Sequence, residues 1–214
     1  MNNNPVVFDG ETFDIKNIQY SAPKSNKAGK FIFTKQDIFV KCRNVYSFGA
    51  SEYKGNDRFK LSIQFNEDSF KQNMMQFEEE LKNDVFRNAK QWLGKDIKTI
   101  DAVDAFVSPI VKTSTKVDKE SQFFHIKLVK DTANGGEWKF ELYNLDRTPI
   151  YPPSPHEDEN INPIDVINSN SDVDIMFHFN GFSIVNGKAH PSLTLYQMKL
   201  NTQFQKKKER KCEL

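Results

Sequence analysis

Two strand-like segments near the end of the chain constrain its fold more than any other feature. Val173–Val185 and Ser192–Leu200 are rich in aromatic and branched residues, and Asn186-Gly187 lies between them. An Asn-Gly pair adopts the two positive φ angles of a type I′ turn, whose twist matches that of paired strands. The pattern therefore predicts a β-hairpin with extra loop residues beside the turn. This hairpin brings rings and basic groups onto one sheet: Phe177, His178, Phe179, Phe182, Tyr196 and Lys199.

Alternation of apolar and polar residues predicts further strands. It is clearest in Arg58–Phe65, where every second residue is apolar and the residues between them are Arg58, Lys60, Ser62 and Gln64. Ile38–Phe48 alternates in the same way, and Phe31–Phe33 indicates a short strand. Gln122–Lys130 and Glu137–Leu145 flank the turn sequence DTANGG and predict a second hairpin. Each strand has one face suited to a core and one suited to water.

One long helix interrupts the strands, over about residues 68–93. Its apolar residues recur at steps of three and four and form a single stripe: Phe70, Met74, Phe77, Leu81, Val85, Ala89 and Leu93. Asp68 or Ser69 is expected to cap its start, and Gly94 to end it. The stripe is expected to pack on the sheet or to plug one end of a barrel. The other face is expected to be solvated: Glu78, Glu79, Glu80, Lys82, Asp84, Arg87 and Lys90.

Length and composition favour one β-rich domain. The chain has 214 residues, of which 13% are aromatic although only 37% are hydrophobic, so rings must supply much of the core. We expect residues 1–30 to form a flexible arm, residues 31–204 a single domain, and the basic residues 205–214 a flexible tail. Within the domain, prolines and clustered acids predict a mobile loop over about residues 151–171.

This order of elements indicates a mainly β fold with one long inserted helix. An OB-like, partly open antiparallel barrel with extra hairpins and loops satisfies the list of elements, and a β-sandwich satisfies it nearly as well. We prefer the barrel. Its exposed strand face and flanking loops suit single-stranded nucleic acid, because unpaired bases can stack on rings while basic side chains follow the backbone.

The candidate nucleic-acid contacts are outward-facing residues of the alternating strands. The net charge is only +1, so attraction to nucleic acid has to come from local clustering of basic groups. Phe123 and Tyr143 are the strongest ring candidates because they stand among charged neighbours. The strand candidates are Arg58, Lys60, Phe123, His125, Lys127, Lys139, Tyr143, Tyr196 and Lys199. The loop that carries Lys112, Lys116 and Lys119 and the basic tail are candidates for phosphate binding or simply soluble segments.

No motif of an enzyme or of a metal site is present. The sequence lacks a phosphate-binding loop, a nucleophile elbow and a His-Glu-x-x-His pair, and its four histidines have no ligand spacing. Cys42 and Cys212 suggest neither a disulfide framework nor a metal site. No apolar run reaches the ~20 residues needed to cross a bilayer. We therefore expect no catalytic residue, metal or cofactor, and a soluble intracellular protein in a reducing compartment.

The final hairpin also resembles a known family. The segment VDIMFHFNGFSIVNGKAHPSLTLYQMKL is similar to the last strands of OB-fold single-stranded DNA-binding proteins from large nucleocytoplasmic DNA viruses and some tailed phages. The shared features are the aromatic-glycine step Phe179–Phe182, the Gly187-Lys188 turn and the end of the last strand at Leu195–Gln197. RFKLSIQF, the inserted helix and FFHIKLVK follow in a compatible order. The likeness thus extends loosely from Ile38 to Leu200.

The resemblance implies sequence-independent binding of single-stranded DNA in viral replication, recombination or repair. It places the protein in a viral factory of the host cytoplasm or in a bacterial host. Single-stranded DNA is then the main partner, RNA is an alternative, and replication proteins and further copies of the chain are candidate partners. Many members end in an acidic tail, whereas this chain ends in KKKERKCEL. The alternatives are a structural β-sandwich of a virion or coat, and a protein-interaction module that uses Tyr151–Pro155.

Overall fold

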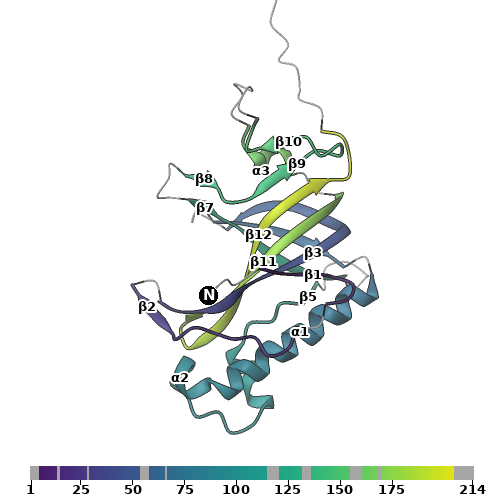
Figure 1. Cartoon of the computed structure of the whole chain (residues 1–214). Coiled ribbons are helices and arrows are strands. Elements are labelled where there is room, and N and C mark those ends of the chain that lie inside the picture. The colour runs from purple at the N-terminus through teal and green to yellow at the C-terminus, as the bar shows by residue number, and fades with distance from the viewer. Residues whose placement is uncertain are drawn as a thin grey trace, which may run out of the picture.

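Five strands form a closed barrel in the computed structural model (Figure 1). The structure describes residues 5–13, 15–27, 29–53, 58–65, 67–114, 121–131, 136–154, 161–167 and 170–204. The barrel strands are β3 (Gly29–Tyr53), β4 (Arg58–Gln64), β6 (Ser121–Leu128), β11 (Ser171–Val185) and β12 (Lys188–Leu200). Their order around the barrel is β12-β11-β3-β4-β6.

A parallel contact between β6 and β12, at Thr194 and Lys127, closes the barrel, while the other neighbours are antiparallel. The first strand pairs with the second and the fourth, and the third pairs with the fifth. Such a five-stranded, mainly β barrel is OB-like. The predicted fold class is confirmed, and the barrel, not the sandwich, is the architecture. The prediction of an antiparallel barrel did not include this parallel closing pair.

The hairpin of β11 and β12 is confirmed and is tighter than predicted. Val185 pairs with Lys188, so Asn186 and Gly187 alone form the turn, with φ angles of 51° and 71°. Both angles are positive, as a type I′ turn requires. The strands are longer than the alternation suggested: β12 begins at Lys188, ahead of the predicted Ser192, and β11 begins at Ser171, ahead of the predicted Val173. The hairpin contributes two of the five barrel strands.

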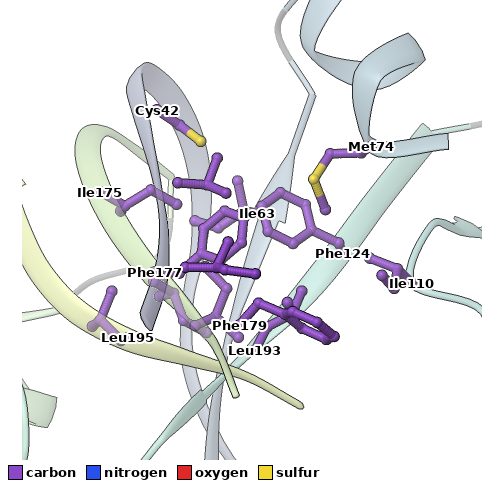
Figure 2. Packing of buried hydrophobic residues seen from close by; sticks show 14 of the residues in the cluster. Cys42, Ile63, Met74, Ile110, Phe124, Ile175, Phe177, Phe179, Leu193 and Leu195 are labelled. Carbon is purple, nitrogen blue, oxygen red and sulfur yellow. The ribbon is translucent and has the colours of Figure 1, made fainter. Parts of the chain in front are cut away.

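Rings from two strands, β6 and β11, lie in the core of the barrel. Phe124 of β6 and Phe177 and Phe179 of β11 are fully buried, and the centroids of the Phe124 and Phe177 rings lie 5.7 Å apart. Figure 2 shows these rings together with Ile63 of β4 and Leu193 and Leu195 of β12. The inward residues alternate with outward ones, as predicted for Arg58–Phe65 and for β6. The high ring content of the chain is thus used in the core.

The predicted helix forms as two consecutive helices, α1 (Asp68–Arg87) and α2 (Ala89–Leu93). Its apolar stripe faces the barrel: Phe70 packs on Phe124 at 5.7 Å between ring centroids, and Phe77 packs on Phe179 at 5.1 Å. Gly94 ends the helix with a φ of 67°, as predicted. The capping prediction is wrong, because Glu67 is the N-cap residue and no side chain caps the helix.

The prediction of a fully solvated second helix face is also wrong. The Tyr20 hydroxyl donates a hydrogen bond of 2.7 Å to Asp84, whose side chain is buried and whose pKa burial raises. Glu78 accepts hydrogen bonds from the backbone of the segment after the 3-10 helix Asp101–Phe106. Asp84 and Glu78 of this face thus bind residues that are distant in the sequence. The helical period of the apolar residues gives no information on such contacts.

Parts of residues 5–13 and 15–27 pair with the sheet or pack on the helix, where we expected a flexible arm. Strand β1 (Val6–Asp9) pairs parallel to β3, and β2 (Lys24–Asn26) pairs with β3 in an antiparallel hairpin. Phe13 and Ile15 are buried, and the Phe13 ring packs on Phe77 at 5.8 Å. Because the region is polar in composition, its buried apolar residues, Phe13 and Ile15, were not identified from the sequence. β3 is a single strand of 25 residues where we predicted two separate strands.

The predicted second hairpin is largely replaced by other pairings. After β6, the chain forms a small hairpin of β7 (Lys130–Asp131) and β8 (Glu137–Trp138). Strand β9 (Glu141–Tyr143) then pairs parallel with β12, and β10 (Pro149–Tyr151) pairs with β9 beyond the barrel (Figure 1). The edge strand β5 (Lys112–Ser114) pairs with β6. Part of the predicted loop forms the short helix α3 (Pro163–Val166).

Gly181 is expected to be essential for the bend of β11. Its φ is 102°, and a Cβ atom at this position would overlap the carbonyl oxygen of Ile32 on β3. Gly181→Ala should therefore lower the free energy of unfolding by more than about 2 kcal/mol. Urea unfolding followed by circular dichroism measures the change.

Gly94→Ala is the matched control, because Gly94 also has a positive φ, of 67°, but a Cβ there meets nothing within 4 Å. It should cost only about 1 kcal/mol, the strain of the left-handed backbone alone. Equal losses in the two variants would show that backbone strain, and not the contact with Ile32, makes Gly181 necessary.

Candidate nucleic-acid interface

A basic surface lies on the outer face of β4 and β6. Because side chains alternate along a strand, Lys60 and Ser62 of β4 and Phe123, His125 and Lys127 of β6 point away from the core. Strand pairing sets Lys60 opposite Lys127 and Ser62 opposite His125. The predicted contacts of these two strands are therefore direct neighbours across the sheet.

His125 occupies the centre of this surface and is neutral. Lys60 Nζ lies 3.2 Å from His125 Nε2, and Ser62 Oγ lies 3.0 Å from His125 Nδ1. An ammonium group can only donate, so Nε2 accepts and the ring proton sits on Nδ1, which donates to Ser62. Burial, followed by the charges of Lys112 and Lys60, lowers the pKa of His125 to about 4.

A groove of about 160 Å³ runs beside this face. One wall is the segment Ser108–Lys112, and the other is the start of β12 at His190–Leu193. Ser108 joins the two walls: its backbone N–H donates to the carbonyl of Ala189 at 2.8 Å, and its hydroxyl lies 2.8 Å from His190 Nδ1. The floor carries Lys60, His125 and Lys127. The groove is thus lined by basic and apolar side chains, and the hydrogen bonds of Ser108 hold its two walls together.

The basic groups of the groove repel one another. Burial and then Lys60 lower the pKa of Lys112, and burial and then Arg58 lower the pKa of Lys127. In the part of the chain that the structure describes, the charged neighbours that act on Lys112, His125 and Lys127 are all cations. A positive surface without a carboxylate partner is suited to bind an anion, since a phosphate would relieve this repulsion.

Helix α1 positions one wall of the groove. Oε2 of Glu78 accepts hydrogen bonds from the backbone N–H groups of Ile110 and Val111, at 2.7 and 3.0 Å. Lys82 in turn lies 3.4 Å from Glu78 and 3.0 Å from Asp104 of the 3-10 helix. These contacts hold the segment that carries Ser108 and Lys112. The acids of the helix are therefore satisfied on their own side and do not neutralise the groove.

Two rings border the cations. Phe123 is half-buried on the outer face, and its ring centroid lies 5.1 Å from that of His125. Tyr53, at the end of β3, is exposed, and Lys60 Nζ lies 5.0 Å from the centre of its ring. Such rings beside basic groups provide surfaces on which unpaired bases can stack. The groove therefore combines the two chemical features expected of a single-strand binding site.

The structure brings together only part of the predicted set. Arg58, Lys60, Phe123, His125 and Lys127 share the β4–β6 face. The others lie elsewhere: Lys139 pairs with Asp131 at 3.2 Å, Lys199 pairs with Asp174 at 3.0 Å, Tyr143 lies on β9, and Tyr196 lies on β12. Lys116 and Lys119 lie outside the described residues.

Sequence reasoning missed several residues of the groove: Tyr53, Ser108, Lys112 as a strand residue, His190 and Ser192. Lys127 Nζ donates to Ser192 Oγ at 3.2 Å across the closure of the barrel. No local pattern marks these positions, because they reach the groove only through the pairing of β3 with β4 and of β5 and β12 with β6. The run of basic residues after Pro109 was the one available signal, and it pointed to Lys112.

Among the described residues, no group of three or more His, Cys, Asp or Glu side chains could hold a metal ion. None of their helices is long and apolar enough to span a bilayer. Cys42 is buried and unpaired, and burial raises the pKa of its thiol.

Comparisons with known proteins find likeness in structure only. No family model and no curated protein matches the sequence. The single-stranded DNA-binding protein from bacteriophage Enc34 has a TM-score of 0.48 and 11% identity, over 91% of this chain and 96% of that chain. The same protein in complex with ssDNA has a TM-score of 0.49 and 11% identity, over 87% and 98%. For gp2.5, a single-stranded DNA-binding protein encoded by bacteriophage T7, the values are 0.45 and 14%, over 84% and 99%. These values are low, so the assignment of the barrel rests on its own strand order.

The neutral state of His125 predicts a pH dependence of stability. Its pKa falls from 6.5 to about 4 on folding, so the unfolded chain binds more protons between these two values. Stability from this group is therefore full above pH 6.5 and is lost as the pH falls toward 4. His125→Gln keeps a polar side chain but cannot titrate. We expect its melting temperature to drop less than that of the native protein between pH 7 and pH 5. An equal drop in both proteins would mean that His125 is not held neutral.

Proposed function

We propose that this protein binds single-stranded DNA without sequence preference. The observation that carries the proposal is the groove on the β4–β6 face, where Lys60, Lys112 and Lys127 lack a carboxylate neighbour among the described residues and two rings lie beside them. A polyanion with exposed flat bases satisfies both features at once, since phosphates neutralise the lysines while bases stack on the rings.

The groove favours an unpaired strand over a duplex. Its cations sit on the concave floor between two walls, so a backbone has to enter the groove to reach them. Phe123 and Tyr53 offer ring faces, which an intact duplex cannot use because its bases are already stacked on one another. The contacts come from lysine ammonium groups and rings, which recognise phosphates and base faces. They give no readout of base edges, and binding is therefore independent of sequence.

Such a protein would coat single strands that arise in viral DNA replication, recombination and repair. Its role would be non-catalytic, because stacking and phosphate neutralisation require no reaction. This role implies the host cytoplasm as the setting. It implies replication proteins and further copies of the chain as partners. The same chemistry would accept RNA, and a comparison of DNA with RNA strands of equal length decides between the two.

Fluorescence anisotropy with a labelled oligo-dT is the direct test. We expect binding at low salt, weakening as salt rises, and a clear preference for the single strand over a duplex of equal length. Absence of binding at low salt, or equal affinity for the duplex, would refute the proposal. Size-exclusion chromatography without DNA separates it from a coat protein, which would assemble by itself.

Removal of one groove lysine should weaken the salt dependence of binding by the amount expected for one lost phosphate contact. Lys127→Gln and Lys60→Gln should each reduce the slope of log affinity against log salt by about 0.7, the value for one phosphate contact on a single strand. Lys90→Gln on the exposed end of the helix is the matched control and should leave the slope unchanged. A similar reduction in all three variants would indicate a general effect of charge and no specific groove.

A further inference from the structure

A second cluster of rings lies on another part of the outer barrel surface, where β3, β11 and β12 are side by side (Figure 1). The rings of Phe39 and His178 are stacked, with centroids 4.6 Å apart and planes inclined by 20°. The Tyr196 ring lies 4.8 Å from Phe39 and is 43% exposed. Tyr196 occupies a bulge, because Leu195 and Gln197 pair with consecutive residues of β11. The bulge places Tyr196 and Gln197 one after the other on the outer side, while Leu195 and Met198 stay buried.

A groove of about 330 Å³ adjoins these rings. Its wall and floor include Lys41, Tyr143, Arg147, Met176, Gln197 and Lys199. Tyr143 also lies near Tyr196: its hydrogen bond to Glu141, followed by burial, the Glu141 charge and Tyr196, raises its pKa to about 12. The phenol is therefore neutral at physiological pH. The groove thus brings the predicted residues Tyr143, Tyr196 and Lys199 together, away from the β4–β6 face.

The acids of this second groove are already satisfied. Asp174 pairs with Lys199 at 3.0 Å and accepts from the backbone of Asn44 at 2.9 Å. Glu141 accepts from the Tyr143 hydroxyl at 2.6 Å and from the Gln197 amide at 2.7 Å. Among the charged residues that line the groove, Lys41, Arg147 and Lys199 outnumber Asp174.

Arg147 and Lys41 supply the remaining charge. Within the described ranges neither forms an ion pair with a carboxylate. Arg147 lies in the turn between β9 and β10 with a φ of 67°, a conformation that residues other than glycine and asparagine rarely adopt. The turn is held by hydrogen bonds from Asn144 to Thr148 and from Arg147 to Asn144, both 2.9 Å. A strained backbone thus places an arginine at the groove.

The two grooves are connected by a single row of paired residues. Lys60 pairs with Lys127, and Lys127 pairs with Thr194. Thr194 in turn pairs with His178, and His178 pairs with Phe39. All five side chains point outward, and neighbouring strands lie ~4.8 Å apart, so the row follows the curved wall of the barrel over four strand-to-strand steps, a path of about 19 Å along the backbone. A strand that enters the first groove can therefore continue over Thr194 onto the second cluster of rings.

We propose that Phe39, His178, Tyr196, Tyr143, Lys41 and Arg147 form a second contact surface for the same single strand of nucleic acid. This inference rests on the proposed function and extends it. Bases stack on Tyr196 and on the Phe39–His178 pair, and Lys41 and Arg147 meet the phosphates. The occupant is a nucleic-acid strand because the surface is continuous with the first groove, presents ring faces and places Lys41 and Arg147 beside them, while the Asp37 carboxylate lies 3.3 Å from His178 Nε2. A short oligonucleotide fills the β4–β6 groove alone, and a longer one fills both.

Oligonucleotide length separates the two surfaces. Anisotropy is measured with labelled oligo-dT of about 5 and about 16 nucleotides, the range that one OB fold covers. Tyr196→Ala should bind the long strand about tenfold more weakly, the loss of one stacked base, and the short strand unchanged. Arg147→Asn, which removes the charge with a residue that tolerates positive φ, should weaken long-strand binding and lower its salt slope by about 0.7.

Phe33→Ala is the matched control, because Phe33 has the same 43% exposure but lies on the β2–β3 hairpin outside the row. It should leave both affinities unchanged, and melting temperatures establish that each variant is folded. If the native protein binds both lengths and neither Tyr196→Ala nor Arg147→Asn weakens the long strand, the second surface is refuted while the first groove stands. Equal loss in Phe33→Ala also refutes it, since any exposed ring would then serve. If the native protein binds neither length, the proposed function itself fails.

Discussion

The contact between β6 and β12 is the constraint on which the rest of the structure depends. Thr194 and Lys127 form the one register pair of this parallel contact, and it turns an open sheet into a barrel. Behind it the rings of Phe124, Phe177 and Phe179 are excluded from water, which provides the driving force for closure. On the outer side of this contact, Lys127 Nζ donates a hydrogen bond to Ser192 Oγ. The same contact therefore completes the core and assembles the basic groove.

Charge is segregated in a molecule whose net charge is only +1. The acids of α1 bind Lys82, Arg87, Tyr20 and the backbone of the segment before β5. The acids near β9 and β11 are likewise engaged, by Lys199 and by side-chain donors. The lysines of the β4–β6 groove have cations as their charged neighbours within the described chain. Arrangement, not total charge, therefore creates a site for a polyanion.

Local patterns predicted much of the framework because they depend on neighbouring residues only. Alternation placed Leu61, Ile63, Phe124 and Ile126 inside and Lys60, His125 and Lys127 outside, and the structure agrees. The period of three and four identified the buried stripe of α1, and Asn186-Gly187 identified the turn. The errors arose where distant contacts override composition. Phe13 and Ile15 anchor a polar segment, and β9 pairs with β12 instead of forming a long hairpin.

The sequence by itself determined which side chains of the alternating strands face water and that rings and lysines share strand faces, because the direction of a side chain follows from the period of its own strand. It could not determine which outward residues become neighbours. Lys139 and Tyr143 follow the same alternation as Lys127, yet β9 carries Tyr143 away to Tyr196 and Arg147, while β12 brings Ser192 and His190 to Lys127. Strand order, register and closure join residues far apart in the chain, so only the tertiary structure decided which of them form one surface.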